Sequence, residues 1–499
     1  MYNAKEFYYG MLNEDERAKI KYLPTMCDLL TQGKEWYADS PAVNNYVSEL
    51  TYSALYEEVG KLRGFLNANG LKKGDKVGLF FRNDADFIKL FFAVTTAGGV
   101  VIPFPVQLPK EALMGSMMKF QVSMLFCADE FAPLCKEMPV KVFSASEITD
   151  CEFAPFAEID KDDDCAIFFT GGTTGRPKGA LLSHGAMMRG SYNGCFVPTD
   201  VIGQRYYALL PFSHIFGTVR NLLSCIHTGS VIYTCTDMKK MFADFQVAKP
   251  SIMVLVPALA DMLLGVATLK GMGALGGNLK MIIAGGATVP PTLIKRWNDA
   301  GVKLLPGYGL TETANLVSGN GLIETVPESV GRPYEAEEVK IIDGEIRIKG
   351  ENLFKCYYND PEETAKAFDE NGYFRTGDLG KFDDDNNLYI VGRSKNLIIL
   401  ANGENVSPEE LELYFYRLPI VKDCLVKEYT NENGFAMIAV EILPNMPAME
   451  KMGIADPVKA LEDATEKINA SLPSYMRISK VIVRDSDFKR TPAMKIVRE

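Results

Sequence analysis

A glycine-rich segment directly after a short apolar run restricts what this chain can fold into more than any other stretch. Residues 170–179 read Thr-Gly-Gly-Thr-Thr-Gly-Arg-Pro-Lys-Gly, and residues 165–169 before them have the character of a buried strand. Glycines let backbone N–H groups close around an anion, and Arg176 and Lys178 supply positive charge. The segment therefore predicts a phosphate-binding loop, although it is neither a Walker A loop nor the dinucleotide-binding turn. The alternative is an ordinary surface loop rich in glycine and threonine.

The composition predicts a cytoplasmic protein that does not act on nucleic acid. Lys and Arg number 53 against 64 Asp and Glu, which gives a net charge of −11. The ten cysteines are scattered without a Cys-x-x-Cys pair and there are three histidines, so neither disulfides nor a zinc site are indicated. The uncharged stretch 90–106 is interrupted by Gly98 and Pro103, so it predicts a buried helix and strand rather than integral membrane association.

Short apolar strands alternate with helices through most of the chain. The helical spacing of Leu55, Val59, Leu62 and Leu66 is followed by strands expected at 77–81, 100–105, 253–256, 281–284 and 302–305. This alternation predicts an α/β fold with a largely parallel sheet that is covered by helices on both faces.

The pattern changes in the last third of the chain. Residues 345–349 alternate strictly, which predicts antiparallel strands in a small barrel-like subdomain. After Arg393 come a helix with Ser407 as N-cap, two strands and a final helix, which predict an α+β domain of about a hundred residues. We expect a large N-terminal domain at 1–393 and a small C-terminal domain at 394–499.

Four further motifs accompany the glycine-rich segment. Residues 306–313 read Pro-Gly-Tyr-Gly-Leu-Thr-Glu-Thr and follow a predicted strand, so they lie where open α/β sheets bind ligands. The others are Tyr-Phe-Arg-Thr-Gly-Asp at 373–378, Gly-Arg-Ser-Lys at 392–395 and Thr-Pro-Ala-Met-Lys at 491–495.

In this order, the motifs resemble the adenylate-forming, AMP-binding superfamily of acyl-CoA synthetases, amino-acid adenylation domains and firefly luciferase. The resemblance covers the chain from Leu50 to Lys495. It implies two half-reactions: a carboxylate attacks the α-phosphate of ATP to give acyl-AMP and pyrophosphate, and a thiol then displaces AMP. The implied cofactors are ATP, Mg²⁺ and coenzyme A, or the phosphopantetheine of a carrier protein.

The resemblance also implies which residues hold the phosphates and the metal. Thr311 would contact the α-phosphate, while Glu312 and Thr170 would hold Mg²⁺, a hard cation that prefers oxygen ligands. The residues expected around the ATP phosphates are Thr170, Gly171, Gly172, Thr173, Thr174, Gly175 and Lys178. Without the resemblance, Glu312 would be interpreted as a carboxylate at a helix start.

The nucleoside of ATP is expected to lie against a second group of residues. Asp378 would accept both ribose hydroxyls, and Arg393 would add donors on the same sugar. The adenine would lie against backbone and stack on a tyrosine, in a slot formed by Gly286, Ala287, Gly307, Tyr308 and Gly309. Taken alone, each glycine pair would be a turn at a strand end.

Three other positions carry roles by resemblance. His214 would contact the substrate carboxylate; the alternative is a core histidine, and His184 and His227 are interpreted as structural. Lys495 would hold the carboxylate and the α-phosphate during adenylation. Because Lys495 belongs to the small domain, that domain is expected to be mobile, with Lys395 as the hinge. Asn402 and Gly403 would then border the tunnel of the pantetheine thiol.

Departures from the family pattern leave alternatives open. Gly172 stands where serine is common, Asn396 where an acid is usual, and Cys356 where a glycine is usual. Ala493 and Met494 precede the catalytic lysine in place of a small, flexible pair, which is an argument for a paralogue without catalytic activity.

The acid itself is only partly defined by the sequence. No Asp lies in residues 207–212, where amino-acid adenylation domains place a partner for an α-amine, so a small-molecule carboxylic acid without an α-ammonium is favoured. The expected acyl pocket consists of Phe212, Phe216, Leu316, Val317 and the Gly286 region. The functions under consideration are an acid:CoA ligase of the fatty-acyl or aryl type, a freestanding enzyme that loads an acyl carrier protein, and a paralogue without catalytic activity.

Overall fold

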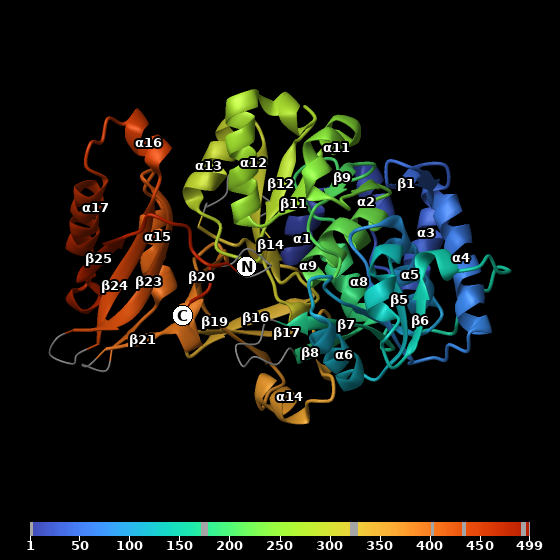
Figure 1. The fold of residues 1–499 in the computed structure, drawn as a ribbon. Helices are drawn as coiled ribbons and strands as arrows, with labels where there is room; N and C mark the ends of the chain where they lie inside the picture. Colours follow the sequence, from blue (N-terminus) through green and yellow to red (C-terminus); the bar gives the residue numbers. More distant parts are fainter. Residues whose placement is uncertain are drawn as a thin grey trace.

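Two large sheets covered by helices form most of the molecule, and a smaller unit lies beside them (Figure 1). The computed structural model describes residues 3–170, 178–319, 328–400, 404–431, 436–490 and 496–498. The α/β class predicted from the alternation of helices and strands is confirmed. Within these ranges, every helix is too short or too polar to cross a bilayer.

The nine-stranded sheet is parallel at its centre. Its order is β15 (Arg332–Pro333), β14 (Ser318–Gly319), β13 (Lys303–Tyr308), β12 (Met281–Ala284), β11 (Ile252–Leu255), β9 (Arg205–Ala208), β10 (Val231–Thr234), β1 (Pro41–Asn44) and β2 (Glu49–Thr51). Ile252 and Val254 belong to one hydrophobic core and Met253 and Leu255 to another. Because both faces of β11 are buried, this strand is apolar at every position. That apolar run made it predictable from the sequence.

Helices cover both faces of this sheet. One face packs against α11 (Met241–Ala248), α12 (Pro257–Lys270) and α13 (Pro291–Asp299), and the other against α8 (His184–Asn193), α9 (Ile215–Gly217), the π-helical turn η3 (Thr218–Leu223) and α10 (Ser224–His227). The two groups supply the two cores between which the sheet lies.

The seven-stranded sheet carries the glycine-rich segment. Its order is β18 (Cys356–Tyr357), β8 (Lys178–Ser183), β7 (Asp164–Thr170), β4 (Val100–Pro103), β3 (Lys76–Phe80), β5 (Val122–Cys127) and β6 (Lys141–Ser144). It is flanked by α4 (Tyr52–Ala68), α5 (Ala85–Thr96), α6 (Lys110–Lys119) and α7 (Ala132–Cys135). Strands β7 and β8 are antiparallel, and Thr170 pairs with Lys178. The segment therefore joins two neighbouring strands rather than a strand and a helix.

A four-stranded antiparallel sheet follows, as the alternation at 345–349 predicted. It consists of β16 (Glu337–Ile342), β17 (Glu345–Gly350), β19 (Phe374–Phe382) and β20 (Leu388–Arg393), with α14 (Pro361–Ala367) between β18 and β19. Asp343 and Gly344, with φ of 53° and 77°, form the two-residue turn between β16 and β17. Left-handed conformations at both central positions are typical of the tight hairpin turn that an Asp-Gly pair favours.

The C-terminal unit has a hydrophobic core of its own, formed by residues between Ile398 and Ile478. Its elements are β21 (Ile398–Ile399), β22 (Asn405–Val406), α15 (Pro408–Tyr416), β23 (Val421–Thr430), β24 (Ala436–Pro444), α16 (Met446–Lys451), α17 (Pro457–Ser471) and β25 (Lys480–Val483). Ser407 caps α15 by accepting a 3.3 Å hydrogen bond from the Glu410 N–H, as predicted. The sequence predicted two strands before the last helix, and the structure adds β25 after it, parallel to β24.

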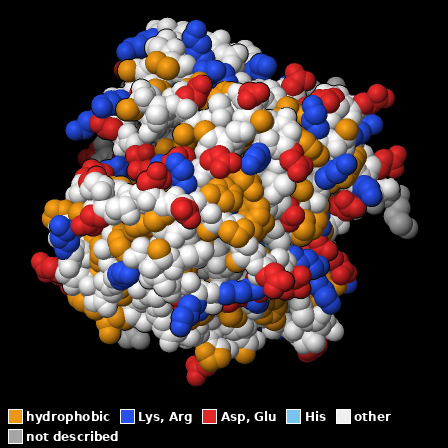
Figure 2. Space-filling model, turned by 90° about the vertical axis from the view of Figure 1, so that its right-hand side faces the viewer, with side chains coloured by type: hydrophobic (Ala, Val, Ile, Leu, Met, Phe, Trp, Pro, Cys, Tyr) orange, Lys and Arg blue, Asp and Glu red, His pale blue; other side chains and the backbone are white. Residues whose placement is uncertain are grey.

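The first fifty residues form helices that the sequence analysis did not anticipate. These are α1 (Ala4–Tyr9), α2 (Glu14–Lys19) and α3 (Met26–Tyr37). The Tyr8 hydroxyl lies 3.1 Å from the Gly319 carbonyl oxygen and 2.5 Å from that of Arg332, at the β14–β15 edge of the large sheet. On the face that Figure 2 shows, positive and negative side chains are interspersed around several hydrophobic patches.

Candidate active site

The predicted phosphate-binding and metal-binding residues come from neighbouring elements. The 3-10 turn η6 (Thr311–Thr313), which follows β13, packs against β7 and β8, the two strands joined by the glycine-rich segment. Thr311 and Glu312 are therefore brought next to the strands that end at Thr170 and begin at Lys178. Residues that follow strands of two different sheets thus lie next to each other.

The predicted ribose-binding residues form a hydrogen-bonded group. Asp378 on β19 pairs in register with Arg393 on β20, and Asp378 Oδ1 lies 2.7 Å from Arg393 Nε. The Tyr308 hydroxyl at the end of β13 donates a 2.8 Å hydrogen bond to Asp378 Oδ2. Burial, together with the Asp378 carboxylate, raises the pKa of Tyr308 well above its usual value, so the phenol keeps its proton and acts as a donor. A carboxylate oxygen can accept more than one hydrogen bond, so Asp378 keeps acceptor capacity for sugar hydroxyls.

Glu312 is a buried carboxylate that accepts a hydrogen bond from a tyrosine. Its exposed fraction is 8%, and its Oε1 accepts a 2.8 Å hydrogen bond from the Tyr357 hydroxyl. Burial raises the pKa of Glu312, while the bond from Tyr357 works in the opposite direction. The alternative role at a helix start is not supported, because η6 has only three residues and Ala314 after it is left-handed.

Lys178 faces an acidic residue that lies outside the sequence motifs. Its ammonium forms an ion pair with Glu363 on α14 and lies 4.8 Å from the centre of the Tyr357 ring. The bonds from Lys178 and then Lys366 lower the pKa of Glu363 to about 2. Neither Glu363 nor Tyr357 is close in sequence to its partner, so no short motif could have revealed them.

Two glycines of the expected adenine slot are required by the backbone itself. A side chain at Gly309 would begin 1.4 Å from the Asn315 carbonyl oxygen, and Gly286 has a φ of 78°. A side chain at Gly285, just after β12, would meet the Phe216 ring at 3.3 Å. The segment that carries His214 therefore reaches the end of β12, where the slot was predicted.

His214 is exposed, so the alternative of a core histidine is wrong. Its Nδ1 caps α9 by accepting a 3.2 Å hydrogen bond from the Phe216 N–H. His184 and His227 are buried instead, and burial lowers the pKa of each to about 4.

Part of the predicted site lies outside the described residues. These positions are Gly171, Gly172, Thr173, Thr174, Gly175, Asn402, Gly403 and Lys495. Their roles stay predictions.

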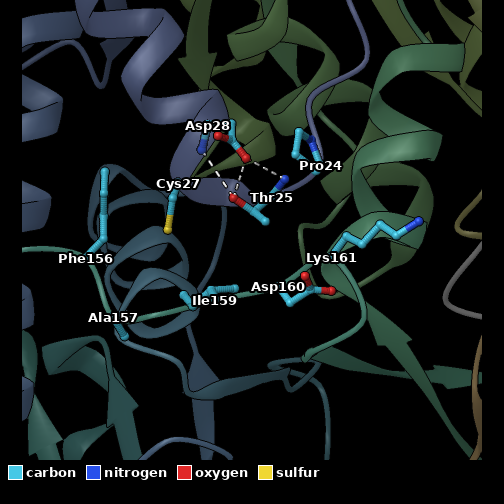
Figure 3. Close-up of a pocket in the computed structure, with 9 residues that line it drawn as sticks. All are labelled: Pro24, Thr25, Cys27, Asp28, Phe156, Ala157, Ile159, Asp160 and Lys161. Carbon is cyan, nitrogen blue, oxygen red and sulfur yellow. Dashed lines mark hydrogen bonds between the residues drawn. The ribbon is translucent and has the colours of Figure 1, made fainter.

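A cavity of 480 Å³ lies elsewhere, between the start of α3 and residues 156–161 (Figure 3). The Thr25 N–H and hydroxyl donate hydrogen bonds of 3.0 and 2.6 Å to Asp28 Oδ2, and these bonds belong to the N-terminal cap of α3. The lining of the cavity contains none of the predicted site residues, so the cavity does not mark the active site.

The donor set at Glu312 fits a magnesium ion that is shared with phosphates. Within the described ranges, no three side chains of His, Cys, Asp or Glu gather as a metal-binding group. Mg²⁺ bound to nucleotide phosphates needs only one or two carboxylates, because phosphate and water oxygens complete its coordination. Glu312 and the Thr170 hydroxyl offer oxygen atoms of the required kind.

Several curated proteins and solved structures are similar to the chain. The putative acyl-CoA ligase YdaB of Bacillus subtilis is 29% identical over 419 residues, which cover 77% of this chain and 82% of YdaB. The long-chain-fatty-acid–CoA ligase FadD13 of Mycobacterium tuberculosis is 26% identical over 493 residues, 92% of this chain and 95% of FadD13. The anthranilate CoA ligase AuaEII in complex with anthranoyl-AMP superposes with a TM-score of 0.84 at 20% identity, covering 96% of each chain.

Family models cover almost the whole chain. The model described as AMP-binding enzyme matches residues 30–358, and the model of the AMP-binding enzyme C-terminal domain matches residues 395–499. The first match alone spans more than half of the 499 residues. The chain therefore belongs to the AMP-binding enzyme family.

Proposed function

We propose that this protein is an ATP-dependent, AMP-forming acid:CoA ligase. It activates a carboxylic acid as acyl-AMP with release of pyrophosphate and transfers the acyl group to the thiol of coenzyme A. The observation that carries the proposal is the group formed by the buried Asp378 with Tyr308 and Arg393. This group lies near η6, and η6 places Glu312 beside the two strands that the glycine-rich segment joins. The similar proteins are named as acyl-CoA and aryl-CoA ligases, which agrees with the proposal.

Each group has a defined task in the proposed reaction. Asp378 accepts the ribose hydroxyls, and Lys178 and Thr311 bind phosphate oxygens. Glu312 and Thr170 would hold Mg²⁺, which would neutralise charge on the triphosphate. Lys495 neutralises the carboxylate nucleophile and the α-phosphate as their negative charges approach each other.

One of the expected acyl-pocket residues, Val317, packs apart from the others. Phe212, Phe216 and Leu316 belong to the same buried core, and Phe212 stacks on Phe87 with ring centres 5.2 Å apart. Val317 packs with Ile346 and Ile348 of the antiparallel sheet instead. We therefore propose Phe212, Phe216 and Leu316 as pocket residues and an acid with an apolar acyl group as substrate.

ATP–pyrophosphate exchange with a panel of acids tests the function. The panel contains straight-chain acids of increasing length, aromatic acids and the amino acids that match them in size. We expect exchange with at least one acid without an α-ammonium and none with its amino-acid counterpart. The active acid is then offered with free CoA and, separately, with a holo-acyl carrier protein. Thioester formation on CoA supports the ligase; exchange without transfer to CoA, or no exchange at all, contradicts it.

A further inference from the structure

One aromatic side chain contacts both charged groups that flank the proposed triphosphate position. We propose that Tyr357 is a positioning residue: its hydroxyl fixes the carboxylate of Glu312, and its ring fixes the ammonium of Lys178. The proposal rests on the proposed function, in which Glu312 meets Mg²⁺ and Lys178 meets the phosphates of ATP.

The hydroxyl end of Tyr357 is directed at Glu312. A phenol has one hydrogen to donate, and the 2.8 Å contact to Glu312 Oε1 uses it. The preceding residues hold the same turn through the backbone, because the Phe354 N–H donates a 2.8 Å hydrogen bond to the Glu312 carbonyl oxygen. The Phe354 ring also packs against Tyr357, with centres 4.8 Å apart. Glu312 is thus held at both its backbone and its side chain.

The face of the Tyr357 ring carries Lys178. The ammonium lies 4.8 Å from the ring centre, within the distance of a cation–π contact, and Glu363 binds the same ammonium. The Tyr357 N–H donates a 3.0 Å hydrogen bond to the hydroxyl of Thr364, which follows Glu363 on α14. The ring and the carboxylate that hold Lys178 are therefore fixed relative to each other.

The backbone of β18 makes Tyr357 suitable for this position and supplies a control. Tyr357 pairs with Ala180 on β8, only two residues from Lys178. The next residue, Tyr358, lies just after β18, and its hydroxyl donates a 2.9 Å hydrogen bond to Gln121 Oε1 instead of to Glu312. Tyr358→Phe consequently removes an equivalent hydroxyl without touching Glu312 or Lys178.

Calorimetric titration with ATP, in Mg²⁺ and in EDTA and without any acid, tests the proposal. Tyr357→Phe removes the contact to Glu312 but keeps the ring under Lys178. We expect its affinity for ATP to fall about tenfold in Mg²⁺, the scale of losing an outer partner of a metal ligand, and to change less than twofold in EDTA. Tyr357→Leu removes both contacts and is expected to weaken ATP binding under both conditions. Tyr358→Phe is expected to match the wild type.

The outcomes separate this proposal from the proposed function. Equal affinity of Tyr357→Phe and wild type in Mg²⁺, or an equal loss in Mg²⁺ and EDTA, overturns the positioning role. If wild type binds ATP with Mg²⁺ but exchanges pyrophosphate with no acid, the ligase assignment fails while the result for Tyr357 still counts. Melting temperatures of all variants show whether the fold is retained, and Tyr357→Phe preserves the packing of the ring, so a folded variant is expected.

Discussion

Asp378 and Arg393 face each other across β19 and β20 with a separation of 2.7 Å between Oδ1 and Nε. Asp378 is 2% exposed, and Tyr308 donates to its other oxygen, so the carboxylate is held in one orientation before any nucleotide binds. A pre-oriented acceptor loses little freedom when a ligand binds to it.

This arrangement predicts how the enzyme recognises the sugar of ATP. In wild type, ATP should bind more tightly than 2′,3′-dideoxy-ATP by roughly tenfold to a hundredfold, because hydrogen bonds from sugar hydroxyls to a buried carboxylate are lost. Asp378→Asn should bind ATP more weakly and lose most of this preference. Competition between the two nucleotides for each protein measures both effects. A variant that still prefers ATP to the same degree would remove Asp378 from the ribose site.

Glu312→Gln should separate catalysis from stability. Glutamine keeps an oxygen for the Tyr357 hydrogen bond but loses the charge, so exchange is expected to fall on the order of a hundredfold. The melting temperature should stay the same or rise, because burial raises the pKa of Glu312 and the charged form therefore destabilises the fold at neutral pH. Glu362→Gln, on the exposed side of α14, removes the same charge and should leave exchange unchanged. A lower melting temperature with normal exchange would give Glu312 a purely structural role.

Lys495 should matter for only one half-reaction. Its proposed role is electrostatic and belongs to the formation of acyl-AMP, so Lys495→Ala is expected to slow acid-dependent exchange by a factor on the order of a hundred or more. Thioester formation from supplied acyl-AMP and CoA should change only a few-fold. Loss of both half-reactions in a folded variant would contradict movement of the small domain between the steps. Loss of neither would mean that another cation, such as Lys489 or Arg490, performs this role.

The buried His227 predicts how stability depends on pH. Its Nε2 lies 2.8 Å from the Lys21 carbonyl oxygen and its Nδ1 3.1 Å from Ser191 Oγ, and burial lowers its pKa from 6.5 to about 4. The unfolded chain takes up the proton at higher pH than the folded one, so the contribution to stability is complete above pH 6.5 and is lost as the pH falls toward 4. In urea titrations at pH 7.5 and 5, His227→Gln should reduce the difference in unfolding free energy by roughly 2 kcal/mol.

The sequence predicted those parts of the molecule whose cause is local. The strands β3, β11 and β12 are apolar at nearly every position because they are buried on both faces, and the start of α15 follows from the Ser407-Pro408 pair. The contact between Tyr357 and Glu312 joins residues 45 positions apart through a two-residue strand, which has no periodicity to detect.

The N-terminal helices were missed for a related reason. The helices α1 and α2 have only six residues each, and residues of all three N-terminal helices pack into the main hydrophobic core rather than following a strong local pattern. The cap of α3 is a Thr-x-x-Asp sequence, whereas the familiar capping signature has Glu or Gln in the last position.

The position of Tyr8 has a consequence for how the protein behaves in concentrated solution. A strand at the border of a sheet presents backbone groups on which another chain can add a strand, and proteins commonly cover such borders. Here the hydroxyl of Tyr8 lies against the carbonyl oxygens of Gly319 and Arg332. These residues belong to β14 and β15, the two strands at one border of the nine-stranded sheet. The helix α1 thus occupies carbonyl groups at this border, and a chain that starts after Leu12 is expected to leave them open to a strand of another molecule.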